Sequence, residues 1–448
     1  MIDIKQLREG PQRFIDGSRA KGIEVDIPRL LELDGRLSEA RKQLQDARTA
    51  QNAAGKQIAQ LTGADKEQAI ARMAELKKQA KALDERIAEL EPPWNLLLMQ
   101  VPQPADPDVP VGRSSDDNVE LLRWNPPWFD PSRGFQDNKG FAPKTHIELG
   151  LALGLMDLER GVKMAGTRSY VLTGKGMELH QALLRLAFDF MVHEQGFTAM
   201  SVPVLVREEL MEGTGFFPFG KDQAYQVNEK DRGGGQDLYL AGTGEVGLMG
   251  LHAGEILEAQ SLPRRYVTVS TCFRREAGAA GKDTAGLYRI HQFDKVEQVV
   301  LCEASQQESR GWHQRMIGFV QTLMQRLELP YRLLQCCTAD LGPKNADMID
   351  IETWMPGRGE LGADGRPMGA YGETHSASRL YDFQCRRLNL RYRDRATRKP
   401  VFCHSLNNTV LASPRILIPI LELYQNADGS ITAPAALRGY LHGVEVIR

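Results

Sequence analysis

The 448-residue sequence has few cysteines, little net charge and no long apolar run, and each shortage excludes a class of protein. Its six cysteines form no C-x-x-C pair and have no partnered histidine spacing, which argues against a zinc site and a disulfide framework. The formal net charge is only −2, so any nucleic-acid contact requires local basic patches. The N-terminus lacks an apolar signal segment and no stretch could span a bilayer, which predicts a cytoplasmic protein that binds no membrane.

Length and composition predict two domains joined by a linker. A chain of this length exceeds one small core, and its 42% hydrophobic and 25% charged residues are typical of a globular protein. Residues 101–143 are rich in proline, aspartate and asparagine. We therefore expect a helical region at 1–100, a linker at 101–143 and a second folded domain at 144–448.

Residues 30–90 have the apolar pattern of two helices. Apolar residues recur at alternating steps of three and four, interrupted by Gln51 and by a turn at 61–65, and the second series ends at Pro92-Pro93. At about 1.5 Å per residue, this predicts an antiparallel coiled-coil hairpin roughly 40 Å long. The expected seam residues are Leu30, Leu33, Leu37, Ala40, Leu44, Ala47, Ala54, Ile58 and Leu61, then Ala69, Met73, Leu76, Ala80, Leu83, Ile87 and Leu90.

Two functions fit such a hairpin. Heptads of this kind commonly form dimers. Alternatively, basic side chains on the outer faces could contact nucleic-acid phosphates, although acidic residues are interleaved with them. Charge alone does not decide between the two, and the basic residues concerned are Arg36, Arg41, Lys42, Arg48, Lys56, Lys66, Lys77, Lys78 and Lys81.

Residues 265–302 predict two strands joined by a polar, glycine-rich loop. Alternation along the second strand, from about residue 291, places Phe293, Lys295 and Glu297 on one face. Phe293 and Glu297 are then roughly 13 Å apart, at about 3.3 Å per residue. That spacing suits a ligand with a flat base at one end and an ammonium group at the other, although an ordinary charged hairpin fits the spacing equally well.

The stretch F-R-x-E, a loop, and then H-Q-F-x-K-x-E resembles motif 2 of class II aminoacyl-tRNA synthetases, and specifically that of the seryl-tRNA synthetases. The resemblance implies that Arg274 holds the α-phosphate of ATP, contacts the serine substrate and acts in catalysis. It also implies that Glu276 reads the adenine amine and that Phe293 stacks on adenine. Glu297 would bind the ammonium group of the amino acid.

Two segments ahead of motif 2 also resemble this family. A helix at about 177–193, followed by a strand that contains Pro203, resembles motif 1, which builds the dimer interface in class II enzymes. The segment A-G-T-G-E at 241–245 is similar to the family's T-A-E, which implies that Thr243 and Glu245 line the serine pocket. Gly244 departs from the usual alanine, and glycine is freer to move.

Beyond motif 2, the segment E-T-H-S at 373–376 matches the family's E-x-x-S. The resemblance implies that Glu373 and Ser376 bind ATP and supply oxygen ligands to Mg²⁺, which prefers such ligands beside phosphates. The following Ser378-Arg379-Leu380 replaces the family's S-N-C and is the largest departure in the chain.

Residues 407–415 resemble motif 3. Ser413 suits a helix N-cap and Pro414 the first helical position, which would place Arg415 in the first turn, where the helix dipole disfavours a cation. That cost favours an anion-binding function over a surface arginine paired with a carboxylate. The resemblance implies that Arg415 contacts ATP phosphates in catalysis and that Thr409 binds the serine hydroxyl. His291 and His375 lie within these motifs without an assigned role.

The resemblance covers the whole chain and implies an α+β fold: an N-terminal antiparallel helical hairpin, then a class II catalytic domain with a mainly antiparallel sheet flanked by helices. The expected activity is ATP-dependent activation of L-serine and its transfer to tRNA(Ser), and to selenocysteine tRNA where present, by a homodimer that uses Mg²⁺. Two alternatives stay open: a diverged paralogue that activates serine or another small amino acid for a carrier protein, and a non-catalytic tRNA-binding protein.

Overall fold

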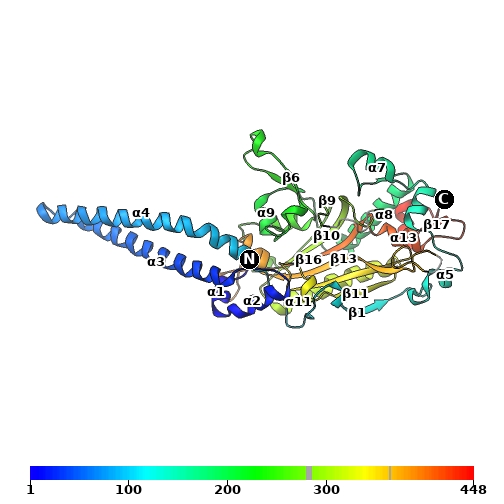
Figure 1. Cartoon of the computed structure of the whole chain (residues 1–448), viewed down its shortest axis with the longest axis horizontal. Helices are drawn as coiled ribbons and strands as arrows, with labels where there is room; N and C mark the ends of the chain where they lie inside the picture. The colour runs from blue at the N-terminus through cyan, green and yellow to red at the C-terminus, as the bar shows by residue number, and fades with distance from the viewer. Residues whose placement is uncertain (279–284, 363–364) are drawn as a thin grey trace. The chain divides into compact units, whose positions relative to one another are not determined.

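The computed structural model describes residues 1–278, 285–362 and 365–448, and the chain divides into two compact units at residues 1–104 and 105–448 (Figure 1). The first unit is helical and consists of α1 (Ile4–Glu9), α2 (Pro11–Ala20), α3 (Ile27–Ile58) and α4 (Gly63–Gln100). No helix in the described part of the chain is both long enough and apolar enough to cross a membrane. All six cysteines are buried and carry free thiols.

The helices α3 and α4 form the predicted antiparallel hairpin, as Figure 1 shows. Asp26 caps α3 by accepting a hydrogen bond from the backbone N–H of Arg29. Part of the expected seam is buried in two clusters, whereas its residues nearest the turn are only partly buried: Ala54, Ile58, Leu61, Ala69, Met73 and Leu76. Gln51, which interrupts the apolar pattern, donates its side-chain N–H to the carbonyl of Leu76 at 2.8 Å. The polar side chain that interrupts the apolar pattern is therefore hydrogen-bonded to the opposite helix.

The prediction that the second helix ends at Pro92-Pro93 is wrong, because α4 continues through both prolines to Gln100. Trp94 packs against the cluster of Leu33, Leu37 and Leu90, and its indole N–H donates to Asp34 at 3.1 Å. Proline in a helix interior removes a backbone hydrogen bond. Burial on the far side of the prolines, including Leu98 at 1% exposure, compensates for that loss.

The second unit is built on an eight-stranded sheet in the order β1-β11-β12-β13-β16-β10-β9-β4. All neighbouring pairs are antiparallel except β4 with β9, in agreement with the predicted fold class. The strands span β1 (Val119–Trp124), β4 (Thr198–Met200), β9 (Arg264–Phe273), β10 (Gln292–Cys302), β11 (Tyr331–Gln335), β12 (Asp347–Met355), β13 (Ala370–Tyr381) and β16 (His404–Ser413).

Two helices cover one face of this sheet and leave the other for the site. Gln298 on β10 donates its side-chain N–H to the carbonyl of Met316 on α11 (Gln306–Arg326), and His180 on α8 (Lys175–Asp189) contacts Asp294 on β10. Asp294 and Gln298 share one face of β10 by alternation. The predicted group of Phe293, Lys295 and Glu297 therefore lies on the opposite face, as the sequence indicated.

Short elements complete the second unit. A three-stranded sheet consists of β5 (Leu205–Arg207), β7 (Leu238–Leu240) and β6 (Tyr225–Val227), and another of β15 (Pro400–Phe402), β14 (Arg391–Arg393) and β8 (Ile256–Glu258). Two-stranded pairs are β2 (Met156–Asp157) with β3 (Val171–Leu172) and β17 (Ile431–Thr432) with β18 (Val446–Ile447). The remaining α-helices are α5 (Gly134–Lys139), α6 (His146–Ala152), α7 (Leu158–Ala165), α9 (Glu208–Gly213), α10 (Glu245–Gly250), α12 (Phe383–Arg387) and α13 (Leu417–Leu423).

The stretch expected as a linker contributes to the second unit. Residues 119–124 form β1, which pairs with β11 at the edge of the large sheet. Phe129 and Phe135 are buried in the main hydrophobic core at 1% and 4% exposure. This proline-rich segment is therefore folded and adds an edge strand to the sheet. Proline is tolerated at the edge of a sheet, where a backbone N–H is not needed for pairing.

Two local expectations fail. Pro203 lies beyond β4 and not within a strand. Ser413 is the last residue of β16 and does not cap a helix, because α13 begins at Leu417 with Ile416 at the N-cap position. The Ser413 hydroxyl instead contacts Nδ1 of His180 at 2.8 Å, so Arg415 precedes the helix and does not lie in its first turn.

Candidate active site

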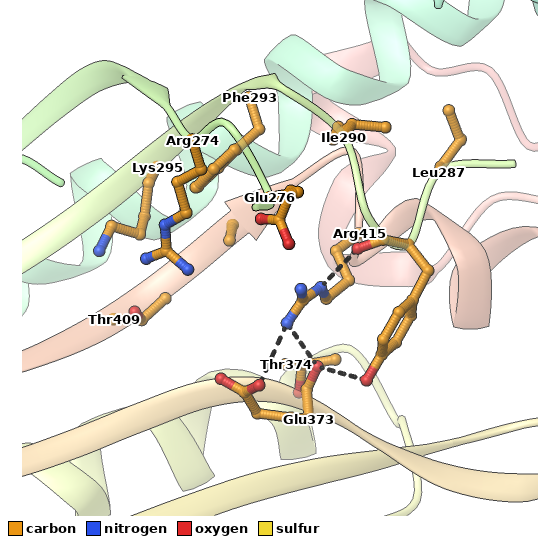
Figure 2. Close-up of a pocket in the computed structure, with 12 residues that line it drawn as sticks. Arg274, Glu276, Leu287, Ile290, Phe293, Lys295, Glu373, Thr374, Thr409 and Arg415 are labelled. Atoms are coloured by element: carbon orange, nitrogen blue, oxygen red, sulfur yellow. Dashed lines mark hydrogen bonds and ion pairs between the residues drawn. The ribbon is translucent and has the colours of Figure 1, made fainter. Parts of the chain in front are cut away.

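A cavity lies over β10, β13 and β16 and is lined by six of the residues that the sequence singled out (Figure 2). A larger hollow adjoins it and shares four of these residues, Arg274, Glu276, Glu373 and Arg415. The larger hollow encloses about 570 Å³, within the range of about 300–1,000 Å³ for small-molecule sites. The six predicted residues in the smaller cavity are Arg274, Glu276, Phe293, Glu373, Thr409 and Arg415.

One end of the cavity combines an aromatic ring with charged groups from the segment after β9. The guanidinium carbon of Arg274 lies 5.3 Å from the centre of the Phe293 ring, and its Nε donates to the carbonyl of Gly242 at 3.3 Å. Glu276 accepts a hydrogen bond from Arg289 at 3.3 Å. A flat base can stack on such a ring, and the guanidinium fork suits a phosphate or carboxylate.

Arg415 is held in place by backbone carbonyls from two different segments. Its Nε donates to the carbonyl of Tyr288 at 3.1 Å and its Nη1 to the carbonyl of Glu373 at 3.0 Å (Figure 2). The Tyr288 ring lies 4.5 Å from the guanidinium of Arg415 and 3.8 Å from that of Arg358. The guanidinium has five N–H donors, so this anchoring leaves others for an anion in the cavity.

A buried polar network includes Lys295, which also lines the cavity. Thr243, Glu245 and Glu297 are 3%, 1% and 0% exposed. The Thr243 hydroxyl donates to Glu297 at 3.2 Å and accepts from Nζ of Lys295 at 2.8 Å, and Lys295 also forms an ion pair with Glu297. The network thus joins the neighbouring Thr243 and Glu245 to Glu297, which lies 54 residues beyond Thr243 in the sequence, and it adds a lysine.

Glu245 is fully engaged by donors from three segments. Lys344 Nζ lies 2.7 Å and 2.8 Å from its two carboxylate oxygens. Gln384 donates to Oε1 at 2.6 Å, and Asn407 donates to Oε2 at 3.3 Å and to Glu297 at 3.1 Å. Lys344, Gln384 and Asn407 were not among the predicted site residues, and their motifs carried no signal that would have placed them against Glu245.

Thr409 lies on β16 opposite Glu297 on β10, and it is 9% exposed. The bulge between these strands falls beside this pair, where the register shifts between Val296 and Glu297. Within the described residues, the Thr409 side chain has no hydrogen-bond partner, whereas the hydroxyl of Thr243 has three. Thr409 is therefore a free hydroxyl that faces the cavity, in the position that the sequence predicted for a substrate contact.

Both departures from the family pattern have a local structural explanation. A Cβ at Gly244 would lie 2.5 Å from Cγ2 of Thr268, so an alanine would clash with the Thr268 side chain. Arg379 is 3% exposed and forms ion pairs with Asp106 at 2.5 Å and Asp347 at 2.8 Å. Residues 378–380 are thus held in place by the ion pairs of the buried Arg379.

Glu373 and Ser376, the predicted metal ligands, are placed differently. Glu373 lines the cavity with a carboxylate that is 48% exposed, whereas Ser376 does not line it and pairs across strands with Asp350. Burial, then the negative charge of Glu373, raises the pKa of Asp350 well above its usual range. Its Oδ1 is a buried oxygen with no hydrogen-bond partner among the described residues.

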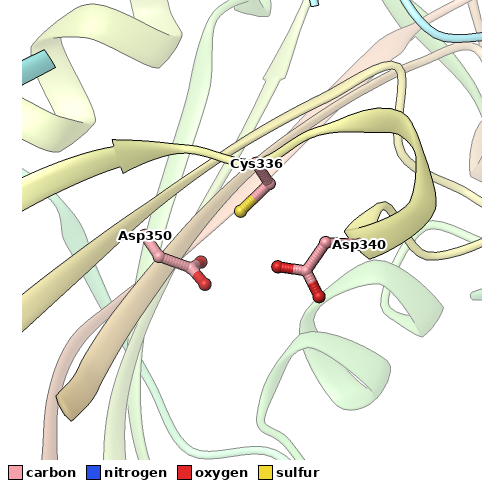
Figure 3. Close-up of side chains that lie close together, drawn as sticks. All are labelled: Cys336, Asp340 and Asp350. Carbon is pink, nitrogen blue, oxygen red and sulfur yellow. The ribbon is translucent and has the colours of Figure 1, made fainter. Parts of the chain in front are cut away.

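Asp350 also belongs to a cluster with Cys336 and Asp340, whose candidate ligand atoms lie within 4.8 Å of one another (Figure 3). Burial raises the pKa of the Cys336 thiol, and Asn118 already donates to Asp340 at 2.8 Å. A thiol with a raised pKa is a poor metal ligand, so Cys336 does not suit metal coordination here.

Two histidines near the site are structural. Burial lowers the pKa of His375 to about 3, and its Nδ1 contacts the Thr374 hydroxyl at 2.9 Å. His180 lies between Ser413 and Asp294, at 2.8 Å and 3.0 Å. Ser413 is fully buried, so this set does not form an accessible nucleophile and instead joins α8, β10 and β16.

Comparison with known proteins identifies the family. The model of the seryl-tRNA synthetase N-terminal domain matches residues 1–104, and that of the class II tRNA synthetase core domain (G, H, P, S and T) matches residues 225–424. The serine–tRNA ligase of Deinococcus radiodurans is 41% identical over 448 residues, which cover 100% of this chain and 99% of that protein. The chain belongs to the seryl-tRNA synthetase family.

Solved structures of seryl-tRNA synthetases share the whole fold. The Pyrococcus horikoshii enzyme, complexed with ATP, has a TM-score of 0.86 at 35% identity and aligns over 100% of this chain and 99% of its own. The cytoplasmic enzyme of Naegleria fowleri, in complex with AMP, has a TM-score of 0.83 at 29% identity with the same coverage. Family membership thus confirms the predicted α+β fold with its N-terminal helical domain.

Proposed function

We propose that this member of the seryl-tRNA synthetase family activates L-serine with ATP and transfers it to tRNA(Ser). The observation that carries the proposal is a single cavity lined by Arg274, Phe293 and Arg415 together with Lys295, whose ammonium contacts the buried Thr243 and Glu297. This arrangement suits a nucleotide at one end and a small amino acid at the other.

In the first step, the carboxylate of serine attacks the α-phosphorus of ATP. A bond forms between the carboxylate oxygen and phosphorus, the bond to the bridging oxygen breaks, and pyrophosphate leaves with that electron pair. Arg274 and Arg415 hold the phosphates in line and stabilise negative charge in the transition state. Glu276 and Phe293 orient the adenine, while Glu297 binds the ammonium group and Thr409 the hydroxyl.

We propose Mg²⁺ as the metal, with ligands from Glu373 and Ser376. Supporting this fit, Asp350 has an unpartnered buried oxygen beside Ser376, and the negative charge of Glu373 acts on it. A local excess of carboxylate oxygens favours a hard divalent cation. When bound, the ion would neutralise phosphate charge, and Glu373 and Ser376 are the residues that would hold it.

In the second step, a hydroxyl of the terminal adenosine of the tRNA attacks the carbonyl of the adenylate and AMP leaves. We assign tRNA binding to the hairpin of α3 and α4. Arg41 and Arg48 pair with Glu91 and Asp84 across the hairpin. In contrast, five lysines have no acidic partner within the described residues and remain for phosphates: Lys42, Lys56, Lys66, Lys77 and Lys78. The same contacts would serve selenocysteine tRNA where present.

We also propose that the protein is a cytoplasmic homodimer. Large apolar side chains are exposed on α6, α7 and α8, namely Leu151 at 52%, Met164 at 74% and Met177 at 42%. Met164 and Met177 line the same surface hollow, and a second copy of this chain would bury them. The free thiols of all six cysteines fit a reducing compartment. Light scattering on the purified protein tests the dimer.

Amino-acid-dependent ATP–pyrophosphate exchange with all twenty amino acids tests the activity. We expect exchange with serine and none with unrelated amino acids, followed by charging of total tRNA. Exchange without charging would favour a paralogue that serves a carrier protein. A protein that binds tRNA but gives no exchange with any amino acid would be non-catalytic, and the proposed function would be wrong.

A further inference from the structure

Lys295 occupies the place that a substrate ammonium would need. Its Nζ forms an ion pair with Glu297 and donates to the Thr243 hydroxyl at 2.8 Å, and the lysine side chain is only 6% exposed. Glu297, at 0% exposure, is a buried carboxylate that requires a cation or several hydrogen bonds to remain charged. In the described structure, that cation comes from the protein itself.

Thr243 and Glu297 have few hydrogen-bonding positions left for a ligand. The Thr243 hydroxyl donates once and accepts twice, from Lys295 at 2.8 Å and from the backbone N–H of Glu245 at 3.2 Å, which is its full capacity. Glu297 also accepts from Asn407 at 3.1 Å. An incoming ammonium can therefore pair with both Thr243 and Glu297 only if Lys295 leaves.

We propose that Lys295 holds the ammonium position of the amino-acid subsite until a substrate that carries both an ammonium and a carboxylate displaces it. The inference rests on the proposed function for the identity of this subsite. Lys295 also lines the cavity with Arg274 and Thr409 (Figure 2). Its displaced ammonium therefore remains in a cavity where the substrate carboxylate supplies a new anion.

Selectivity for amino acids over simple amines follows from this exchange. A displaced lysine ammonium in a largely buried cavity is costly unless an anion accepts it. Serine brings its own carboxylate, whereas ethanolamine has the same ammonium and hydroxyl groups but no carboxylate. Lys295 thus makes occupation of the ammonium position conditional on a carboxylate.

Ethanolamine binding to Lys295→Met tests the proposal. Methionine keeps the length of the side chain but removes the ammonium, so ethanolamine should bind Lys295→Met at least tenfold more tightly than it binds the wild type in calorimetric titration. Lys221→Met is the matched control, because it removes a lysine that pairs with the exposed Glu208 and lines neither cavity. Its ethanolamine affinity should change by less than about threefold, since Lys221 does not line the cavity.

Unchanged or weaker ethanolamine binding by Lys295→Met overturns the proposal, as does an equal gain in both variants, which would reflect the loss of a lysine charge alone. A wild-type crystal structure with a non-hydrolysable seryl-adenylate analogue supplies a second measurement if Lys295→Met does not fold. Lys295 should then lie beyond hydrogen-bond distance of Glu297, and a retained ion pair overturns the proposal. Failure of the proposed function has a separate readout, the absence of serine-dependent exchange by the wild type.

Discussion

The ammonium group of Lys344 lies 2.7 Å and 2.8 Å from the two carboxylate oxygens of Glu245. With Gln384 and Asn407, these contacts provide a donor for each of the four lone-pair positions of the carboxylate. Glu245 therefore has no free acceptor for a substrate hydroxyl. This contact favours Thr409, whose hydroxyl has no partner within the described structure, as the group that reads the serine side chain.

Lys344→Met should destabilise the second unit by about 3–5 kcal/mol, because it leaves a buried carboxylate without its cation. The side chains of Lys344 and Glu245 are 12% and 2% exposed, so solvent does not replace the lost ion pair. Urea unfolding measures the change. The exposed pair of Lys221 and Glu208, at 53% and 41%, supplies a control, and Lys221→Met should cost less than about 1 kcal/mol. Similar losses in the two variants would contradict this prediction.

Arg274→Ala and Arg415→Ala should each reduce ATP–pyrophosphate exchange by about 10²–10³-fold or more while leaving the fold intact, because both guanidinium groups are proposed to hold phosphates. Arg438, which pairs with Glu445 on the surface, supplies the control variant Arg438→Ala. Circular dichroism verifies folding. Near-normal exchange in either site variant would refute its phosphate contact.

Thr409→Val should erode the preference for serine over alanine without weakening ATP binding. A pocket built to hydrogen-bond a hydroxyl rejects an analogue that lacks it, since its polar groups are then buried unpaired at about 1–3 kcal/mol each. Threonine is excluded by one methyl group, also worth about 1–3 kcal/mol. Exchange rates with serine, alanine and threonine measure the effect, and Glu297→Gln should weaken all three alike. An unchanged serine-to-alanine ratio would place hydroxyl recognition elsewhere.

Shortening the hairpin should preserve serine-dependent exchange and reduce tRNA charging at least tenfold. Gln51 on α3 contacts the carbonyl of Leu76 on α4 at 2.8 Å, so residues 52–75 can be replaced by a short Gly/Ser turn that joins adjacent ends. The buried clusters near the base stay intact. Exchange monitors the catalytic unit and aminoacylation monitors tRNA binding. Undiminished charging would show that the distal hairpin serves another purpose, such as dimerisation.

Acid should destabilise the second unit partly through His375, whose pKa burial lowers to about 3. An unfolded histidine has a pKa of about 6.5, so below that value the unfolded state binds a proton that the folded state does not. The contribution is fully present above about pH 6.5 and is lost as the pH falls towards 3, by roughly 1.4 kcal/mol per pH unit. Urea unfolding between pH 7 and pH 5 should show a shallower decline for His375→Leu than for the wild type. Equal slopes would contradict the assignment.

The sequence by itself determined the features that depend on local periodicity and on motif spacing. Steps of three and four residues predicted the hairpin of α3 and α4, and alternation predicted that Phe293, Lys295 and Glu297 share one face of β10. Motif spacing also selected Arg274, Glu276, Glu373 and Arg415, which the structure brings to one cavity. These predictions succeed because each depends on residues that are close in the sequence. Within one helix or strand, the regular backbone geometry fixes which of those residues share a face.

Only the tertiary structure decided which buried charges meet. Lys344 and Gln384 reach Glu245 from 99 and 139 residues away, because strand order and register bring together segments that no local pattern relates. The failed predictions have the same cause. Tertiary packing around Trp94 stabilises the continuation of α4 beyond Pro92 and Pro93. The Ser413 hydroxyl contacts His180 and therefore does not cap a helix. A long-range contact that satisfies a buried polar group can outweigh a local preference of about 1 kcal/mol.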